Sequence, residues 1–191
     1  MGKDAPVTVV NGKSIEWGQN VDKIAAETVP YRDGGNCIFF ATQEAYQYFY
    51  GGGGFAEEEF NRFRSGIHDF VVGERERTGV STGIADFAMS VAFMVPYLAK
   101  KQIAVTAIKT TGQNIGVAKR TYAELENFPF VDATSESKFK PPFMVMTESS
   151  SGGPGHVFFV RDKNDYGGKV EIHMHPGDEI VAFVNVEKAK Q

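Results

Sequence analysis

The last third of the chain consists of short apolar runs, rich in β-branched and aromatic residues, that alternate with polar turns. The intervening loops are rich in Gly, Ser, Asn and Asp, as expected for turns between strands. The runs are PFMVMT (142–147), HVFFV (156–160), KVEIHM (169–174) and EIVAFVNV (179–186). An earlier run, IAVTAIK (103–109), predicts one more strand, and residues 121–139 predict an irregular connection with a short helical turn at YAELE. Together these features predict an antiparallel meander.

The first half of the chain has helical periodicity instead. Between residues 37 and 49 apolar side chains recur every three or four positions, and the GGGG run (51–54) predicts the end of that helix. A second helix is expected after three consecutive glutamates, with an apolar face of Phe60, Phe63, Ile67 and Phe70. A third is expected to begin near Gly83 and to end or bend at Pro96. Helices followed by strands predict the α+β class.

Length and composition indicate one soluble globular domain. A chain of 191 residues can bury one hydrophobic core, and its 42% hydrophobic and 23% charged residues are ordinary for such domains. We therefore expect a single domain over residues 1–191. It divides into an N-terminal hairpin and lead-in (1–30, with an Asn-Gly turn at 11–12), a helical part (31–101) and an antiparallel sheet part (102–191).

The charge balance and the N-terminus limit the expected partners and location. The formal net charge of −4 argues against a nucleic-acid partner, because phosphate binding needs clustered Lys and Arg. No stretch approaches the roughly 20 apolar residues of a membrane span. The opening residues, MGKDAPVTVV, lack the apolar run of a signal peptide. We expect a soluble protein made in the cytoplasm, with delivery to a host cell or secretion by a non-classical route left open.

Cys37 is the only cysteine in the chain, and it follows Gly-Gly-Asn at the start of the first expected helix. Asn36 is a natural N-cap, so the thiol would lie where the helix dipole favours an anion. A thiolate is the nucleophilic form of cysteine, and such a position lowers its pKa. The backbone N–H of Cys37, at the start of the expected helix, could also face an oxyanion. The structural alternative is a buried cysteine that fills space in the core.

His156 opens the apolar strand HVFFV after a glycine-rich turn. A general base is well placed on such a rigid element, although a purely structural histidine would fit there too. If KVEIHM is a strand, alternation places Glu171, His173 and His175 on one face, where one of them could orient His156. A metal site at His173 and His175 is the alternative. We expect no metal and no cofactor.

The order of these elements resembles the papain-like cysteine hydrolases. Cys37-Ile-Phe-Phe-Ala is similar to the nucleophile helix of papain-like enzymes and of the CHAP cell-wall amidases, and Gly155-His156-Val-Phe-Phe-Val is similar to their histidine strand. His173 lies where these families carry a third polar residue, and a Cys-His-His set is similar to that of NlpC-type peptidases. The helix expected over 83–95 resembles the second helix of viral leader proteases and of bacteriocin-processing peptidases.

The resemblance implies a nucleophile helix packed on the antiparallel sheet, with Cys37, His156 and His173 as the catalytic residues. Cys37 would attack an amide carbonyl, His156 would transfer the proton and His173 would hold the imidazole, by way of a thioester. The Cys37 sulfur and the His156 ring are then expected within about 4 Å of each other. A polypeptide is the favoured substrate and a peptidoglycan peptide the alternative. A non-catalytic binding or assembly module of the same fold is the rival interpretation.

One position departs from the papain-like pattern. Many of these enzymes place a Gln or Asn several residues before the cysteine, where it completes the oxyanion hole. Tyr31 and Arg32 occupy those positions here, and the nearest polar candidates are Asp33 and Asn36. A carboxylate at Asp33 would repel an oxyanion, so the identity of the oxyanion partner stays open.

Overall fold

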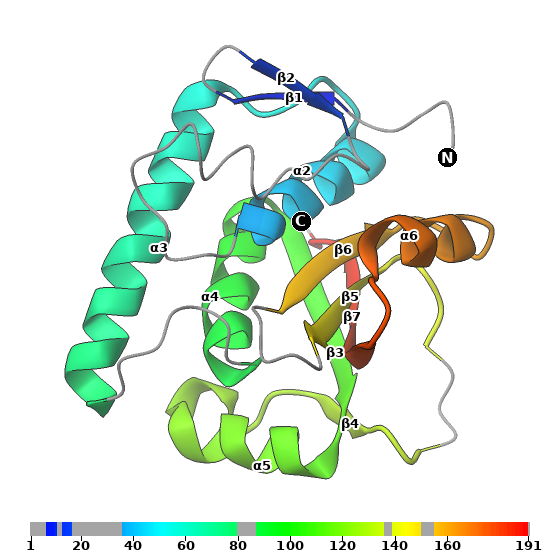
Figure 1. The fold of residues 1–191 in the computed structure, drawn as a ribbon. Helices are drawn as coiled ribbons and strands as arrows, with labels where there is room; N and C mark the ends of the chain where they lie inside the picture. Colours follow the sequence, from blue (N-terminus) through cyan, green and yellow to red (C-terminus); the bar gives the residue numbers. More distant parts are fainter. Residues whose placement is uncertain are drawn as a thin grey trace.

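The computed structural model describes residues 7–10, 13–16, 36–79, 87–135, 139–149 and 155–190. This part of the chain has a mixed α+β architecture, in agreement with the predicted class: five α-helices, a five-stranded mixed sheet and a separate two-stranded hairpin (Figure 1). No helix in these residues is long and apolar enough to cross a membrane.

The helices predicted in the first half are present. The five helices are α2 (Asn36–Tyr50), α3 (Glu57–Thr78), α4 (Phe87–Lys100), α5 (Gly112–Thr121) and α6 (Asp165–His173). The glycine run ends α2 as expected, since Gly51 and Gly52 have positive φ angles of 76° and 93°. Pro96 lies within α4 and does not end it. The predicted start near Gly83 falls outside the described residues.

The sheet has the strand order β4-β3-β7-β5-β6. Its strands are β3 (Ile103–Thr110), β4 (Phe130–Asp132), β5 (Phe143–Ser149), β6 (His156–Val160) and β7 (Asp178–Lys188). Four of the predicted runs form strands within a few residues of their expected bounds. The predicted meander is wrong in its order, because β7 lies between β3 and β5 and pairs antiparallel with both. The short β4 pairs in parallel with β3.

The N-terminal hairpin and the short helical turn were also predicted. Strands β1 (Val7–Val10) and β2 (Lys13–Glu16) pair antiparallel, with Val10 opposite Lys13, and the Asn-Gly turn between them lies outside the described residues. The turn in YAELE is a 3₁₀ helix, η1 (Ala123–Leu125). Helix α5 was not predicted, because its two glycines and irregular apolar spacing weaken the helical pattern. Thr111 caps this helix, with its side chain accepting a hydrogen bond from Asn114 N.

The predicted strand KVEIHM (169–174) is wrong. Residues 169–173 form the second half of helix α6, and Met174 is the residue that follows the helix. Tyr166, Val170 and Met174 recur every four positions and pack beside Phe158 and other residues of the sheet, which is helical spacing. Two adjacent glycines before Lys169 hide the start of this helix in the sequence, since glycine disfavours helix.

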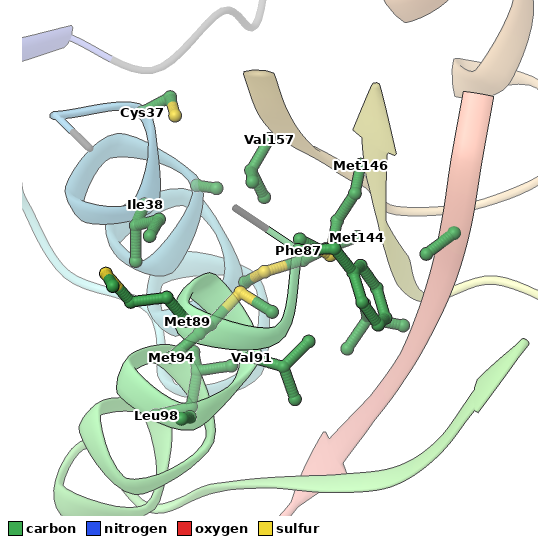
Figure 2. Packing of buried hydrophobic residues seen from close by; sticks show 14 of the residues in the cluster. Cys37, Ile38, Phe87, Met89, Val91, Met94, Leu98, Met144, Met146 and Val157 are labelled. Atoms are coloured by element: carbon green, nitrogen blue, oxygen red, sulfur yellow. The ribbon is translucent and has the colours of Figure 1, made fainter. Parts of the chain in front are cut away.

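The two faces of the sheet bury two apolar clusters. On one face Met144, Val157 and Phe159 pack with α2, α3 and α4, and Figure 2 shows part of this larger cluster. On the other face Phe158 and its neighbours pack with α6. Of the predicted apolar face of α3, Phe60, Phe63 and Ile67 are buried in the larger cluster, and Phe70 packs against it while partly buried. Helices α2 and α6 therefore lie on opposite faces of the sheet, both next to its edge strand β6.

Candidate functional site

Cys37 and His156 lie at the starts of two neighbouring elements. Helix α2 packs on β6, and the two run side by side in the same direction (Figure 1). At the far end of both elements the rings of Tyr48 and Phe49 meet Phe159, with centroids 5.7 and 6.4 Å apart. The first turn of α2, which carries Cys37, therefore lies toward the end of β6 that begins with His156.

The Cys37 side chain is buried. It is 5% exposed and belongs to the larger apolar cluster, together with Val157, the residue after His156. Figure 2 shows it on the first turn of α2, on the side of the helix that faces β6. A burial this deep is also typical of a cysteine that fills core space. The expected separation of about 4 Å between the Cys37 sulfur and His156 stays a prediction.

His156 and His173 are joined by a hydrogen bond. His156 Nε2 lies 2.8 Å from His173 Nδ1, and the two rings lie 5.0 Å apart with an angle of 26° between their planes. His173 also stacks on Phe158, with centroids 4.9 Å apart and planes within 6° of each other. These contacts hold the His173 ring by its face and by one nitrogen, and through that nitrogen they fix the orientation of the His156 ring.

Burial keeps His173 neutral. It is 8% exposed, and its desolvation, together with the positive charges of His156 and Lys169, lowers the pKa of the imidazole to about 2. A neutral imidazole has one N–H donor and one acceptor nitrogen. When His173 Nδ1 is the acceptor, His156 Nε2 carries the proton, and His156 Nδ1 is left with a lone pair. In that tautomer His156 can act as a base through Nδ1.

The other two residues of the predicted triplet do not join this pair. Because residues 169–173 are helical, Glu171, His173 and His175 do not share a face, and that prediction is wrong. Glu171 and His175 are exposed, and the backbone N–H of His175 donates to the Asp178 carboxylate. The strand geometry that suggested a metal site at His173 and His175 is therefore absent. The described residues contain no cluster of three or more His, Cys, Asp or Glu that could hold a metal ion.

A buried ion pair near the site was not predicted. Lys169 Nζ of α6 donates to Glu44 Oε1 of α2, and both side chains are buried. Burial raises the pKa of the Glu44 carboxyl, and the positive charge of Lys169 opposes that rise. The sequence carried a signal for Glu44, because it lies between Ala41 and Tyr48 on the stripe of α2 that begins at Cys37.

A second buried charge contacts Asn36, the residue before Cys37. Arg64 of α3 is 1% exposed, and its Nη1 donates a 2.5 Å hydrogen bond to Asn36 Oδ1. Asn36 is the first residue of α2, one residue before the thiol. The signal for Arg64 was its position on the apolar stripe of α3, four residues after Phe60 and three before Ile67. A guanidinium on a buried stripe needs a polar partner, and here the partner is the asparagine beside the cysteine.

The oxyanion candidates are the residues at and just before the start of α2. Tyr31, Arg32 and Asp33 lie outside the described residues. Asn36 is buried, and its side-chain oxygen accepts the bond from Arg64. The backbone N–H of Cys37 lies in the first turn of α2, where the N–H groups have no partner within the helix.

Comparisons of the chain with protein-family models, with curated proteins and with solved structures found no match.

Proposed function

We propose that the chain is a papain-like cysteine hydrolase that cleaves an amide bond, with Cys37 as nucleophile, His156 as general base and acid, and His173 as the residue that orients His156. The observation that carries the proposal is the 2.8 Å bond from His156 Nε2 to the buried, neutral His173. This bond lies at the start of β6, and α2, the helix that carries Cys37, begins beside the same end of that strand. A papain-like site needs these two features together.

The hydrogen bond favours different roles for the two imidazole nitrogens of His156. With Nε2 engaged by His173, Nδ1 is the nitrogen of His156 that can take the thiol proton. The imidazolium that forms then donates from Nε2 to His173 Nδ1, which accepts without changing its own protonation. A carboxylate would stabilise this cation more strongly than a neutral imidazole does. We therefore expect His173 to orient His156 more than it activates it.

Two nearby features favour the thiolate of Cys37. The N-terminus of α2 carries partial positive charge from its backbone dipoles, and Arg64 adds a buried cation that binds the side chain of Asn36, the residue before Cys37. Both lower the pKa of a thiol, which opposes the effect of burial.

His156 belongs by alternation to the α6 face of the sheet, while Cys37 lies on the α2 face. Because β6 is an edge strand, the imidazole at its first residue can approach the thiol around the edge of the sheet.

The chemical steps balance without a cofactor. The thiolate adds to the amide carbonyl, the C–N bond breaks, and the amine leaves with the proton that His156 took from the thiol. Water then hydrolyses the thioester, losing a proton to His156 and returning the thiol. A polypeptide is the favoured substrate, and a peptidoglycan peptide would be cleaved by the same steps.

The burial of Cys37 favours a second candidate, a non-catalytic binding module of the same fold. Iodoacetamide labelling at pH 6 separates the two, because an ordinary thiol with a pKa near 8.5 is almost wholly protonated there. The hydrolase predicts that Cys37 reacts faster than N-acetylcysteine does, and that His156→Ala slows the reaction. Slow labelling that is equal in wild type and His156→Ala would contradict the hydrolase and support the module.

A further inference from the structure

The ion pair between Glu44 and Lys169 connects two helices that are far apart in the sequence and lie on opposite faces of the sheet. One of them, α2, carries Cys37, and the other, α6, carries His173. We infer that this ion pair is a positioning device that fixes the register of α6 against α2, and so holds the His173–His156 pair in place relative to the thiol. The inference rests on the hydrolase proposed above.

The spacing along each helix supports this role. Lys169 precedes His173 by four residues, so both project from one face of α6, about one turn or 6 Å apart. Glu44 follows Cys37 by seven residues, so both project from one face of α2, about two turns or 10 Å apart. A shift or rotation of α6 against α2 would therefore break the ion pair and displace the His173 ring together.

Other contacts of α6 fix the helix to the sheet. Tyr166 and Val170 pack on the sheet face that holds Phe158. At the helix start, Asp165 accepts a hydrogen bond from the backbone N–H of Arg161, the residue that follows β6. A nine-residue helix with two glycines has little stability of its own, so its placement depends on such tertiary contacts.

The burial of the pair indicates a role other than stability. Glu44 is 4% and Lys169 is 7% exposed, so both charges have lost their water. Buried ion pairs often stabilise a fold no more than apolar residues of similar size would, whereas they require one defined geometry. A positioning role accounts for a buried pair that joins the two helices of the site.

The test compares two double variants. Glu44→Leu/Lys169→Met replaces the pair by apolar side chains of similar length. Glu59→Leu/Lys101→Met makes the same changes in a partly buried ion pair of 2.8 Å that joins α3 to the residue after α4 and includes no residue of α2 or α6. For each protein the rate of Cys37 alkylation by iodoacetamide is measured from pH 5 to pH 9, beside the thermal unfolding midpoint.

We expect Glu44→Leu/Lys169→Met to fold with a midpoint near that of wild type, while its alkylation profile shifts upward by about one pH unit and the rate at pH 6 falls about tenfold. The Glu59/Lys101 control should keep the wild-type profile. A role in stability alone would change the midpoint and leave the profile in place, which would overturn the inference.

A second variant keeps the test decisive if the apolar pair does not fold. Glu44→Gln/Lys169→Gln removes both charges and can keep a neutral hydrogen bond, and its profile should shift in the same direction by a smaller amount. A folded form of either variant with the wild-type profile overturns the inference. Failure of the hydrolase itself is a separate result: wild type would then label like an ordinary thiol, and His156→Ala would change nothing.

Discussion

Phe158 and His173 stack face to face, with ring centroids 4.9 Å apart and planes within 6°. One ring comes from the edge strand and the other from the last residue of α6. Because His173 also bonds His156, the phenyl ring supports the orientation of both histidines. This relationship gives the first prediction.

Replacing Phe158 by Leu should slow Cys37 alkylation at pH 6 several-fold, since the smaller aliphatic side chain offers no flat surface to His173. Because leucine leaves part of the buried volume empty, the swap should also lower the free energy of unfolding by on the order of 1–2 kcal/mol. Phe159→Leu is the matched control, because Phe159 is equally buried on the opposite face of the same strand. Equal alkylation rates in the two variants would exclude a role for the stacking.

The lowered pKa of His173 predicts a loss of stability in acid. In the unfolded chain this histidine titrates near pH 6.5, whereas in the fold its pKa is about 2. Below pH 6.5 the unfolded state therefore binds more protons, and the free energy of unfolding falls as the pH falls. Between pH 6.5 and 4.5 this one group should remove on the order of 2 kcal/mol.

Urea unfolding at pH 6.5, 5.5 and 4.5 checks the acid effect. His173→Gln should lose clearly less stability than wild type over this range, since glutamine does not titrate. His175→Gln is the control, because His175 is exposed, and it should lose as much as wild type. If the free energy of unfolding of His173→Gln fell as steeply with decreasing pH as that of wild type, the prediction would be contradicted.

Turnover of single alanine variants tests the third member of the site. Cys37→Ala should abolish peptide hydrolysis, and His173→Ala should lower it by about 10- to 100-fold, because a neutral imidazole orients His156 without supplying charge. Glu171→Ala and His175→Ala should keep wild-type turnover, since both side chains are exposed. Wild-type activity in His173→Ala would remove it from the mechanism.

Arg64→Met should raise the pH at which Cys37 is half alkylated and should destabilise the fold by about 2 kcal/mol, because the buried Asn36 oxygen loses a charged donor. Arg62→Met is the control on the same helix, as its side chain is 70% exposed. The alkylation profile and the urea midpoint are measured on both. An unchanged profile in Arg64→Met would show that the guanidinium serves the fold alone.

The sequence predicted most elements whose apolar spacing is unambiguous. HVFFV is buried through its length after the first residue, and the stripe from Phe60 to Ile67 lies wholly in the core, so the burial of each segment follows from its pattern. The strand predicted for KVEIHM was wrong because the apolar residues of this segment also alternate with polar ones, as they would in a strand. The helical spacing becomes visible only when Tyr166 is included, beyond two glycines that oppose a helix.

The candidate site was predicted in part for the same reason. His156 and His173 were expected to interact, and they do, although His173 approaches from a helix on the far face and not from a paired strand. The ion pair of Glu44 with Lys169 was out of reach, because it joins positions 125 residues apart that only the tertiary fold brings together. A buried Glu or Lys in a sequence indicates that a partner exists, without indicating which residue it is.

The two border strands of the sheet are short, with three residues in β4 and five in β6. Exposed strand edges are the places where sheets of separate molecules join and start aggregates, and short edges limit the number of hydrogen bonds that such joining can form. The longest strand, β7, is protected because it lies between β3 and β5. In the described part of the chain, β7 has the longest row of backbone groups that another molecule could pair with, and both of its edges are already occupied by neighbouring strands.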